Sequence, residues 1–427
     1  MSDGFRWHPA ARLFDRTGGE VRQAGSPPPP SPPHQGEGRR QDPQAGAVFP
    51  DSAAGLAAAI GHPAFRIGAG NLHPPDPHQA PVLETLTSGS TGQPRRIRRT
   101  QGSWTASFEV NAGFGIGPGA RVAILGQLVH SLSLYGAVEG LHLGAEVHLL
   151  ADLRPDRQRR ALADRRITHL YATPAQLRLI LGQADVAGAL PDLRLILVGG
   201  SKLDGTLRAG LAALAPAAEV REFYGAAETS FVTLADAGTP EASVGRAYPG
   251  VELRFDEDGT IWVQSPYLFL GYAGDCRAEA GPGAAPSPLV GEGGGGGASA
   301  ARWRGGWLSV GEVGRLEGGF LTLRGRAGRM VTVADQNVFP EEIEGFLLGL
   351  PGIERAAVLA QPDAARGKRL VAVLQGDRTQ EAAILAALRA ELGPTRAPKA
   401  VVWRQDWLVL PSGKTDLRAL EAELWPA

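Results

Sequence analysis

The sequence predicts an α/β protein with a large N-terminal domain of mostly parallel sheets and helices, followed by a small C-terminal α+β domain. Two observations support this prediction. Short apolar runs alternate with stretches of helical periodicity through most of the chain, which is typical of parallel sheets covered by helices. After about residue 325 this alternation gives way to a compact mixture of helices and strands. The length of 427 residues is enough for two or three domains.

The large domain is predicted from five short apolar runs and from the helical stretches between them. The predicted strands are 82–87, 121–126, 145–150, 168–172 and 193–199. The predicted helices are 156–166, 174–183 and 203–215, the last with Leu203, Leu207, Leu211 and Leu214 on one face. Because parallel neighbours need crossover connections, this repetition of strand, helix and strand favours a mostly parallel sheet.

The small domain begins with a helix predicted over 340–350. Pro340 suits a first-turn position, and Glu341 and Glu342 lie near the positive end of the helix. The elements after it are strands at 355–360, 369–375 and 399–403, a helix over 379–392 and a last helix from 416. We place the domain boundary at 325–329, so the large domain covers 51–325 and the small domain covers 326–427.

Two segments have a composition that does not suit a packed core. The first, 22–50, is rich in proline and polar residues, so residues 1–50 are predicted to be a largely disordered N-terminal segment. The second, 277–302, is rich in glycine and alanine and is predicted to be a low-complexity surface loop of the large domain. Both are interpreted as spacers without a function of their own.

Composition excludes several classes of protein. The chain has 43 basic and 44 acidic residues, so its balanced charge gives no global field that would attract nucleic acid or anionic lipid. A single cysteine, Cys276, excludes an internal disulfide framework and a CxxC site. No run of about 18 apolar residues predicts a membrane span, and the first residues lack the apolar region of a secretory signal. We therefore expect a soluble protein of the reducing cytoplasm.

Residues 87–95, with the sequence TSGSTGQPR, directly follow a predicted strand. Two glycines permit tight turns, and the hydroxyl and amide groups can donate hydrogen bonds to an anion, as a loop around a triphosphate requires. The residues concerned are Thr87, Ser88, Gly89, Ser90, Thr91, Gly92 and Arg95. The spacing differs from that of the Walker loop. On this segment alone, a plain turn rich in serine and glycine stays open.

Four more segments carry residue types that suit nucleotide chemistry. In YGAAETS (224–230), after a predicted strand at 219–223, Glu228 is a hard oxygen ligand for Mg²⁺ and Tyr224 has a flat apolar face with a polar tip. The other segments are GWLSVGEVG (306–314), GRAGR (325–329) and LPSGKTD (410–416). Only four of the 43 basic residues are lysines, so Lys414 in the last segment is a stronger functional candidate than an average lysine.

In this order, the five segments resemble the adenylate-forming (AMP-binding) superfamily, which includes acyl- and aryl-CoA synthetases, adenylation domains of peptide synthetases and luciferase-like ligases. The resemblance runs from about residue 82 to 420. It implies that the two domains are joined by a hinge at 325–329. It also implies that Tyr224 stacks on adenine, Thr229 contacts the α-phosphate, and Glu228 helps to hold Mg²⁺.

The resemblance implies roles for further residues. Glu312 stands where the family has an aspartate that accepts hydrogen bonds from the ribose hydroxyls, and Arg326 would contact the same ribose. Lys414 matches the lysine that bridges the carboxylate and the α-phosphate during adenylation. The glycine pair at 199–200 resembles the pair beside the adenine. These positions, with Gly225 of the second segment, complete the expected nucleotide site: Gly200, Tyr224, Gly225, Glu228, Thr229, Glu312, Arg326 and Lys414.

His130 lies where many acyl-CoA synthetases have an aromatic residue or a histidine that lines the acid pocket. Taken alone, a histidine at the end of an apolar strand is more often a structural residue than a ligand contact.

The sequence departs from the family pattern at several positions. Arg95 replaces the lysine of the phosphate loop, and arginine keeps the charge and can bind phosphate with two hydrogen bonds. Asp335 replaces a glycine of the loop that enters the active site for the thioester step. Only 86 residues precede Thr87, so the N-terminal part of the large domain is expected to be shortened. Because of this shortening, the resemblance does not identify the acid.

These observations predict an ATP-dependent acid ligase. A carboxylate would attack the α-phosphate of Mg·ATP, and a thiol would then take the acyl group from the adenylate. CoA is favoured as the acceptor because 121–150 resembles synthetases, and the phosphopantetheine of an acyl carrier protein is the second choice. A non-catalytic module that binds a nucleotide or an acyl group is the alternative. A P-loop NTPase built on Gly413, Lys414 and Thr415 is excluded, since Leu408 stands where that loop requires glycine.

Overall fold

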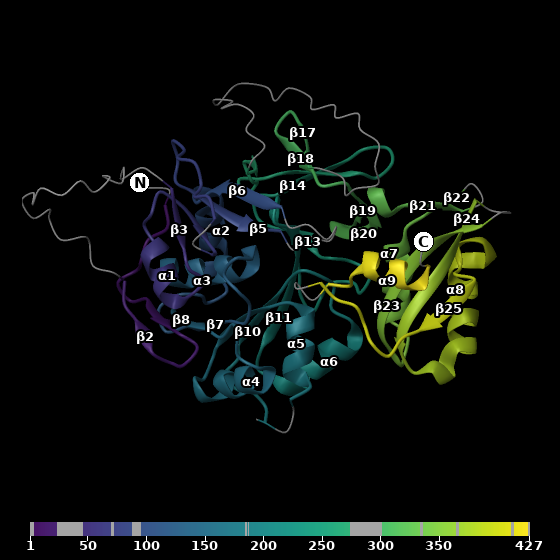
Figure 1. The fold of residues 1–427 in the computed structure, drawn as a ribbon, viewed down its shortest axis with the longest axis horizontal. Coiled ribbons are helices and arrows are strands. Elements are labelled where there is room, and N and C mark those ends of the chain that lie inside the picture. The colour runs from purple at the N-terminus through teal and green to yellow at the C-terminus, as the bar shows by residue number, and fades with distance from the viewer. Residues whose placement is uncertain are drawn as a thin grey trace, which may run out of the picture.

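The computed structural model describes residues 4–23, 46–69, 72–87, 95–183, 186, 188–273, 301–333, 336–363, 367–410 and 414–425. Figure 1 shows a small domain beside a larger one, with the C-terminal strands and helices gathered in the small domain. In the part of the chain that the structure describes, no helix is both long enough and apolar enough to cross a membrane.

A nine-stranded sheet forms the centre of the large domain. Its strand order is β13-β12-β11-β10-β9-β7-β8-β1-β2. The strands are β1 (Arg12–Phe14), β2 (Glu20–Val21), β7 (Arg121–Ile124), β8 (Glu146–Leu149), β9 (His169–Ala172), β10 (Leu195–Val198), β11 (Glu219–Ala226), β12 (Ser230–Ala235) and β13 (Arg246–Ala247). Strands β11, β10, β9, β7, β8 and β1 run parallel, and the strands at the two ends are antiparallel. The predicted mostly parallel sheet is confirmed.

Both faces of this sheet are buried, as the continuous apolar runs predict for parallel strands. Successive residues of a strand point to opposite faces, so Ile124 and Leu197 join one core while Ala123 and Ile196 join the other. The helices of the large domain are α1 (Ala53–Ala59), α2 (Gly102–Ala112), α3 (Ser131–Leu143), α4 (Pro155–Asp164), α5 (Pro174–Leu181) and α6 (Gly205–Leu214). The second core holds the apolar faces of α4, α5 and α6.

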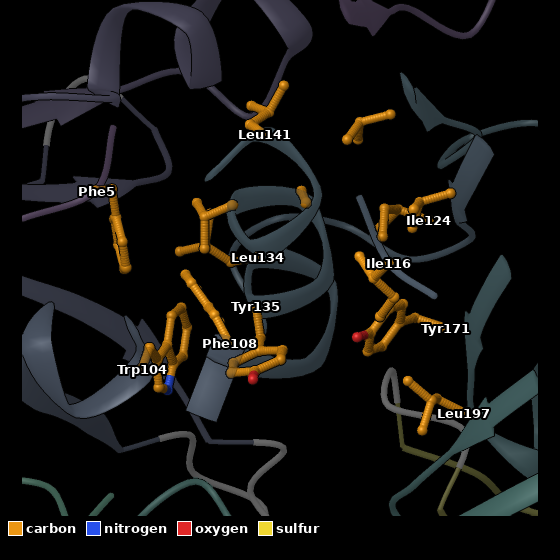
Figure 2. Packing of buried hydrophobic residues seen from close by; sticks show 14 of the residues in the cluster. Phe5, Trp104, Phe108, Ile116, Ile124, Leu134, Tyr135, Leu141, Tyr171 and Leu197 are labelled. Carbon is orange, nitrogen blue, oxygen red and sulfur yellow. The ribbon is translucent and has the colours of Figure 1, made fainter. Parts of the chain in front are cut away.

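Helix α3 packs in the first core, against α2 and the sheet. Figure 2 shows the rings of Trp104 and Phe108 near Tyr135. Their centroids lie 5.2 and 5.3 Å from the Tyr135 centroid, in the edge-on arrangement that aromatic pairs favour. The α3 helix ends at Gly144, whose φ of +97° is a left-handed conformation that glycine adopts without strain.

The prediction of a largely disordered segment over 1–50 is wrong for the described parts of that range. Strand β1 pairs in parallel with β8, in the register Leu13 to Val147. Leu13 and Phe5 are both buried in the first core. Residues 46–50 also contain β3 (Ala47–Phe49) of a second sheet. An isolated three-residue run such as Arg12–Phe14 carries no strand signal of its own, and its stability comes from the strand beside it.

The second sheet contains five strands in the order β16-β6-β5-β4-β3. The remaining members are β4 (Ala64–Ile67), β5 (Val82–Leu86), β6 (Arg96–Thr100) and β16 (Gly271–Tyr272). A four-stranded sheet contains β14 (Glu252–Phe255), β15 (Ile261–Gln264), β18 (Trp307–Ser309) and β17 (Arg302–Arg304), and β19 (Glu312–Glu317) pairs with β20 (Phe320–Arg326). The Pro-rich stretch at 24–45 and most of the predicted loop at 277–302 lie outside the described residues.

The small domain has hydrophobic cores of its own, and every member of these cores lies at or after Val331. Its elements are β21 (Val331–Val333), β22 (Gln336–Val338), α7 (Pro340–Leu348), β23 (Ile353–Asp363), β24 (Gly367–Gly376), α8 (Glu381–Arg396), β25 (Ala400–Trp403) and α9 (Leu417–Leu424). Pro340 is the first residue of α7, as predicted. Helix α8 runs past the predicted end at 392, with a break at Gly393, where φ is +74°.

The connection between the domains is the short 3₁₀ turn Ala327–Arg329 after β20. Glutamates at the start of α7, in the small domain, bind residues at the end of β20. Arg324 Nε donates to Glu342 Oε1 at 2.9 Å. The Arg326 backbone amide faces Glu341 Oε1 at 3.4 Å. We keep 325–329 as our proposed boundary, because it lies between the cores of the two domains.

Candidate active site

Three of the predicted site residues form one hydrogen-bonded group. The Tyr224 hydroxyl, near the end of β11, donates to Glu312 Oε2. The other oxygen of that carboxylate, Oε1, lies 3.4 Å from Arg326 Nε. The register of the β19–β20 pair explains this contact, since Glu312 and Arg326 stand directly opposite each other. The structure therefore brings together the residues expected at an adenine and a ribose.

Lys414 reaches this group from the small domain. Its loop is closed by a hydrogen bond from the Leu410 amide to the Lys414 carbonyl at 2.8 Å and by one from Trp407 Nε1 to Thr415 Oγ1 at 3.0 Å. Burial lowers the pKa of the Lys414 ammonium, and Arg326 lowers it further. The carboxylates of Glu312 and Glu228 act in the opposite direction and raise that pKa.

The pKa of Lys414 thus depends on Glu228 and Glu312 of the large domain and on Arg326 at the connection between the domains, since all three lie within electrostatic reach of the ammonium. A buried ammonium within electrostatic reach of these groups can offset negative charge that a carboxylate and a phosphate bring together. Residues 411–413 of the same segment lie outside the described residues.

The turn that carries Glu228 is built around Gly225 and Thr229. A Cβ at Gly225 would lie 1.8 Å from the Ser230 carbonyl oxygen, so only glycine fits there. The Thr229 side chain is buried, and its hydroxyl accepts a hydrogen bond from the Ala226 amide at 2.9 Å. Thr229 therefore stabilises the turn in this structure, and its contact with an α-phosphate remains a prediction.

Glu228 is fixed by a neighbour that the sequence analysis missed. Its carbonyl accepts a hydrogen bond from the Phe269 amide at 2.9 Å, and its Oε1 accepts one from the Tyr272 hydroxyl at 2.9 Å. Tyr272 lies in the two-residue strand β16, which is too short to give a sequence signal.

Arg99, on β6, is a second residue that the sequence analysis missed. It is almost fully buried and donates to the carbonyls of Ala227 and Tyr267 and to Ser103 Oγ. Burial lowers the pKa of Arg99 to about 10, so its guanidinium stays charged at neutral pH. The sequence contains a usable signal here, because strand alternation places Arg99 on the same buried face as Ile97. Its bond to Ala227 holds the residue immediately before Glu228.

The predicted phosphate loop is anchored at both ends. Strands β5 and β6 are antiparallel neighbours, the Thr87 amide donates to the Arg95 carbonyl, and the Arg95 amide donates to Thr87 Oγ1, each at 2.8 Å. The residues between them, 88–94, lie outside the described residues, as does Asp335. The guanidinium carbon of Arg95 lies 3.3 Å from the centre of the Tyr272 ring. The end of the loop is therefore next to the residue that binds Glu228.

His130 and Gly200 each lie at the end of an element, His130 at the start of α3 and Gly200 two residues after β10. His130 is the N-cap residue of α3, and its backbone bridges to Leu86, the last residue of β5 before the phosphate loop. Burial lowers the pKa of His130, so at neutral pH its imidazole is neutral, as an uncharged pocket wall would require. Gly200 has φ of +100°. Neither residue joins the hydrogen-bonded group of Tyr224, so their roles remain predictions.

The residues present fit a magnesium ion that is held mainly by a nucleotide. Among the described residues, no three His, Cys, Asp or Glu side chains gather as a metal site. Mg²⁺ characteristically binds through one or two carboxylates, waters and substrate phosphates rather than in a cage made by protein alone. Glu228 offers such a carboxylate beside the anchored phosphate loop.

Known proteins are similar to this chain in sequence. The sequence profile of the AMP-binding enzyme family matches residues 26–273, and that of the AMP-binding enzyme C-terminal domain matches 342–414. The chain is 32% identical to an uncharacterized acyl-CoA ligase, YhfT, of Bacillus subtilis, over 78% of this chain and 67% of that protein. It is 28% identical to the indoleacetate–CoA ligase of Aromatoleum aromaticum, over 85% of this chain and 72% of that protein.

A solved structure has the same fold. The amide bond synthetase McbA from Marinactinospora thermotolerans superposes with a TM-score of 0.68 at 23% identity, covering 88% of this chain and 79% of that one. The profile of the first family covers more than half of the chain, and the second profile covers most of the small domain. The chain therefore belongs to the AMP-binding enzyme family, within the adenylate-forming superfamily.

Proposed function

We propose that this protein is an AMP-forming acid–thiol ligase that adenylates a carboxylic acid with Mg·ATP and passes the acyl group to CoA. The observation that carries the proposal is the burial of Lys414, from the small domain, within electrostatic reach of Glu228, Glu312 and Arg326. The arrangement joins a bridging cation, a metal ligand and a ribose acceptor at one place. A module that only binds a nucleotide would need no such cation between the acid and the phosphates, so the non-catalytic alternative is not favoured.

In the first half-reaction, a carboxylate oxygen of the acid attacks the α-phosphorus of ATP. The bond from that phosphorus to the bridging oxygen breaks, and pyrophosphate leaves with the bond's electron pair. Lys414 lowers the repulsion between the carboxylate and the phosphate, because its ammonium offsets negative charge on both. Glu228 would hold Mg²⁺, which neutralises charge on the phosphates when it is bound.

Glu312 and the phosphate loop position the nucleotide in this scheme. Glu312 can accept hydrogen bonds from ribose hydroxyls, and its carboxylate is oriented by Tyr224 and Arg326. The cation of Arg95, at the end of the 87–95 loop, can bind the triphosphate. In the second half-reaction, a thiolate attacks the acyl carbon and AMP leaves.

The acceptor and the acid belong to the proposal. CoA is proposed because curated relatives are named as acyl-CoA, indoleacetate–CoA and feruloyl-CoA ligases. The phosphopantetheine of an acyl carrier protein is the second choice. The names of these relatives, and of a further one named as a putative long chain fatty acid-CoA ligase, define the acids to test first, namely arylacetic, hydroxycinnamic and long-chain fatty acids. A cytoplasmic location is also proposed, since the single cysteine suits a reducing compartment.

ATP–pyrophosphate exchange without CoA tests the proposal. Each of the three classes of acid is assayed with the full chain, and Lys414→Ala serves as the matched inactive variant. Exchange that depends on one acid, and that the variant loses, supports the ligase and identifies its substrate class. Absence of exchange with every acid, in a folded sample that binds ATP, would support the non-catalytic module instead. Adding CoA or a phosphopantetheinylated carrier protein afterwards distinguishes the two acceptors.

A further inference from the structure

Tyr272 connects two parts of the site that are far apart in sequence. Its hydroxyl donates to Glu228 Oε1 at 2.9 Å, while its ring lies under the Arg95 guanidinium, 3.3 Å from the guanidinium carbon to the ring centre. One side chain thus contacts both the proposed metal ligand and the cation at the end of the phosphate loop. Neither contact follows from the sequence.

The backbone around Tyr272 is well fixed. Strand β16 pairs with β6 in the register Tyr272 to Ile97. The amides of Leu270 and Ala273 donate to the carbonyls of Arg98 and Arg96, at 2.8 and 2.9 Å. Since β6 begins directly after Arg95, the strand that positions the phosphate loop also positions Tyr272.

The side chain of Tyr272 is equally constrained. Its ring packs against the small core of Ile97, Phe269 and Leu308, and makes an edge-on contact with Phe269 at 5.2 Å. An ordinary phenol has a pKa of about 10, so the Tyr272 hydroxyl carries a proton at neutral pH and can donate it in a hydrogen bond to the carboxylate.

A hydrogen bond to one carboxylate oxygen fixes the rotation of the whole group. With Oε1 occupied by Tyr272, the second oxygen of Glu228 has a defined direction in which to act as a metal ligand. Ligating carboxylates in metal sites are characteristically oriented by such outer partners. The Tyr272 ring positions the guanidinium of Arg95 by a different interaction, because a cation is attracted to the face of an aromatic ring.

We propose that Tyr272 is a positioning residue that orients Glu228 toward Mg²⁺ and Arg95 toward the phosphates of the same nucleotide. The inference rests on the proposed function for the identity of the nucleotide and the metal. It assigns separate tasks to the two parts of one side chain. The hydroxyl acts on the metal ligand, and the ring acts on the phosphate-loop cation.

Two variants separate these tasks, and a third is the control. Tyr272→Phe removes the hydroxyl and keeps the ring, whereas Tyr272→Leu removes both. Tyr267→Phe is the matched control, because this nearby tyrosine is buried and donates to the Pro249 carbonyl at 2.6 Å rather than to Glu228. Thermal unfolding of each variant checks that it is folded.

The readout is metal binding in a complex that does not react. Mn²⁺ is titrated into the full chain with α,β-methylene ATP, and free Mn²⁺ is measured by electron paramagnetic resonance. We expect Tyr272→Phe to raise the Kd for Mn²⁺ about tenfold, as loss of an outer partner typically does. Its metal-free affinity for the nucleotide should stay within about twofold of the wild-type value, since the ring over Arg95 remains. Tyr272→Leu should weaken that metal-free affinity as well.

A double-mutant comparison excludes a merely structural effect. If the hydroxyl acts through Glu228, Tyr272→Phe should change the Mn²⁺ affinity of a Glu228→Gln protein by less than about twofold. Equal losses in both backgrounds, or wild-type Mn²⁺ affinity in Tyr272→Phe, would overturn the proposal. Failure of the ligase function is distinguishable, because it would abolish acid-dependent exchange in the wild type while these binding differences remain.

Discussion

The guanidinium of Arg329 donates hydrogen bonds to both carboxylate oxygens of Glu344, at 2.7 and 3.1 Å. It also lies 3.3 Å from Glu341 Oε1 and donates to the Val358 carbonyl at 3.2 Å. These partners belong to α7 and β23 of the small domain. Arg329 is therefore tied to the small domain, and a rotation between the domains would use backbone bonds that precede it.

The Arg329–Glu344 pair should contribute to the stability of the small domain. We expect Arg329→Ala and Glu344→Ala each to lower the free energy of unfolding by about 2 kcal/mol, because each removes both hydrogen bonds between two partly buried charges. The double variant should lose less unfolding free energy than the two single variants lose together, with a coupling energy of about 1 kcal/mol or more. Urea unfolding of the four proteins measures this coupling, and additive losses would contradict a direct interaction.

Lys414 should be required for chemistry rather than for nucleotide binding. We expect Lys414→Ala to lower the rate of acid-dependent exchange about 100- to 1,000-fold, since it removes the charge between acid and phosphate. The affinity for ATP should change far less, and calorimetry checks this. Exchange that survives unchanged in the variant would show that the cation is not part of the mechanism.

The pH dependence of exchange provides a separate test of Lys414. Its pKa is lowered by burial, so the ammonium loses its proton below the usual lysine value of 10.5. The exchange rate of the wild type should therefore fall as pH rises. The midpoint of this fall should lie at a lower pH than the titration of an ordinary lysine. Lys414→Arg should lack this basic limb, because arginine stays protonated there. If the exchange rates of both proteins fall at the same high pH, a group other than Lys414 is responsible for the fall.

Glu312 should determine affinity for the ribose. We expect Glu312→Gln to weaken ATP binding about tenfold, because hydrogen bonds from ribose hydroxyls to a charged acceptor are stronger than those to an amide. Glu317→Gln is the matched control, since Glu317 is on the same strand but exposed at the surface. Calorimetry with ATP and with 2′-deoxy-ATP tests the assignment. A similar loss for both nucleotides in Glu312→Gln would leave the 2′-hydroxyl without a role.

The buried carboxyl of Glu139 should make stability depend on pH. Burial raises its pKa to about 7, although Tyr171, Asn111 and Tyr135 donate hydrogen bonds to it. The folded protein thus keeps a proton that the unfolded chain releases near pH 4.5. The resulting stabilisation is complete below that pH and is lost as pH rises through about 7.

A comparison with Glu139→Gln isolates this effect. The wild type should lose up to about 3 kcal/mol of unfolding free energy relative to the variant between pH 4.5 and pH 8. Urea unfolding at several pH values measures the difference between the two proteins, in which the titration of all shared groups cancels. Parallel pH profiles would mean that Glu139 keeps the same protonation state on unfolding.

Much of the architecture could be predicted from local patterns. The strands at 121–126, 168–172 and 193–199 were recognisable because both faces of a parallel sheet are apolar. Two very short strands were not, since β1 and β16 contain three and two residues and depend on their neighbours. Periodicity cannot reveal a strand whose stability comes from a partner elsewhere in the chain.

The site was predicted only in part, for a different reason. Tyr224, Glu312 and Lys414 stand in segments whose order is informative, and the structure brings them together. Arg99 binds the carbonyl of Ala227, the residue before Glu228, from 128 positions away in the sequence. Tyr272 binds Glu228 itself from 44 positions away. Tertiary packing determines such contacts, so they cannot be predicted from the sequence of one segment.

The position of β1 has a consequence for synthesis on the ribosome. Arg12 of β1 contacts Glu146 of β8, 134 positions later in the chain. At roughly 5–20 residues per second, the nascent N-terminal strand waits on the order of ten seconds before its partner is made. During that interval Phe5 and Leu13 have no sheet to cover them. Strand β1 therefore pairs with β8 only after the segments between them have been synthesised, and its apolar side chains stay uncovered by that partner until then.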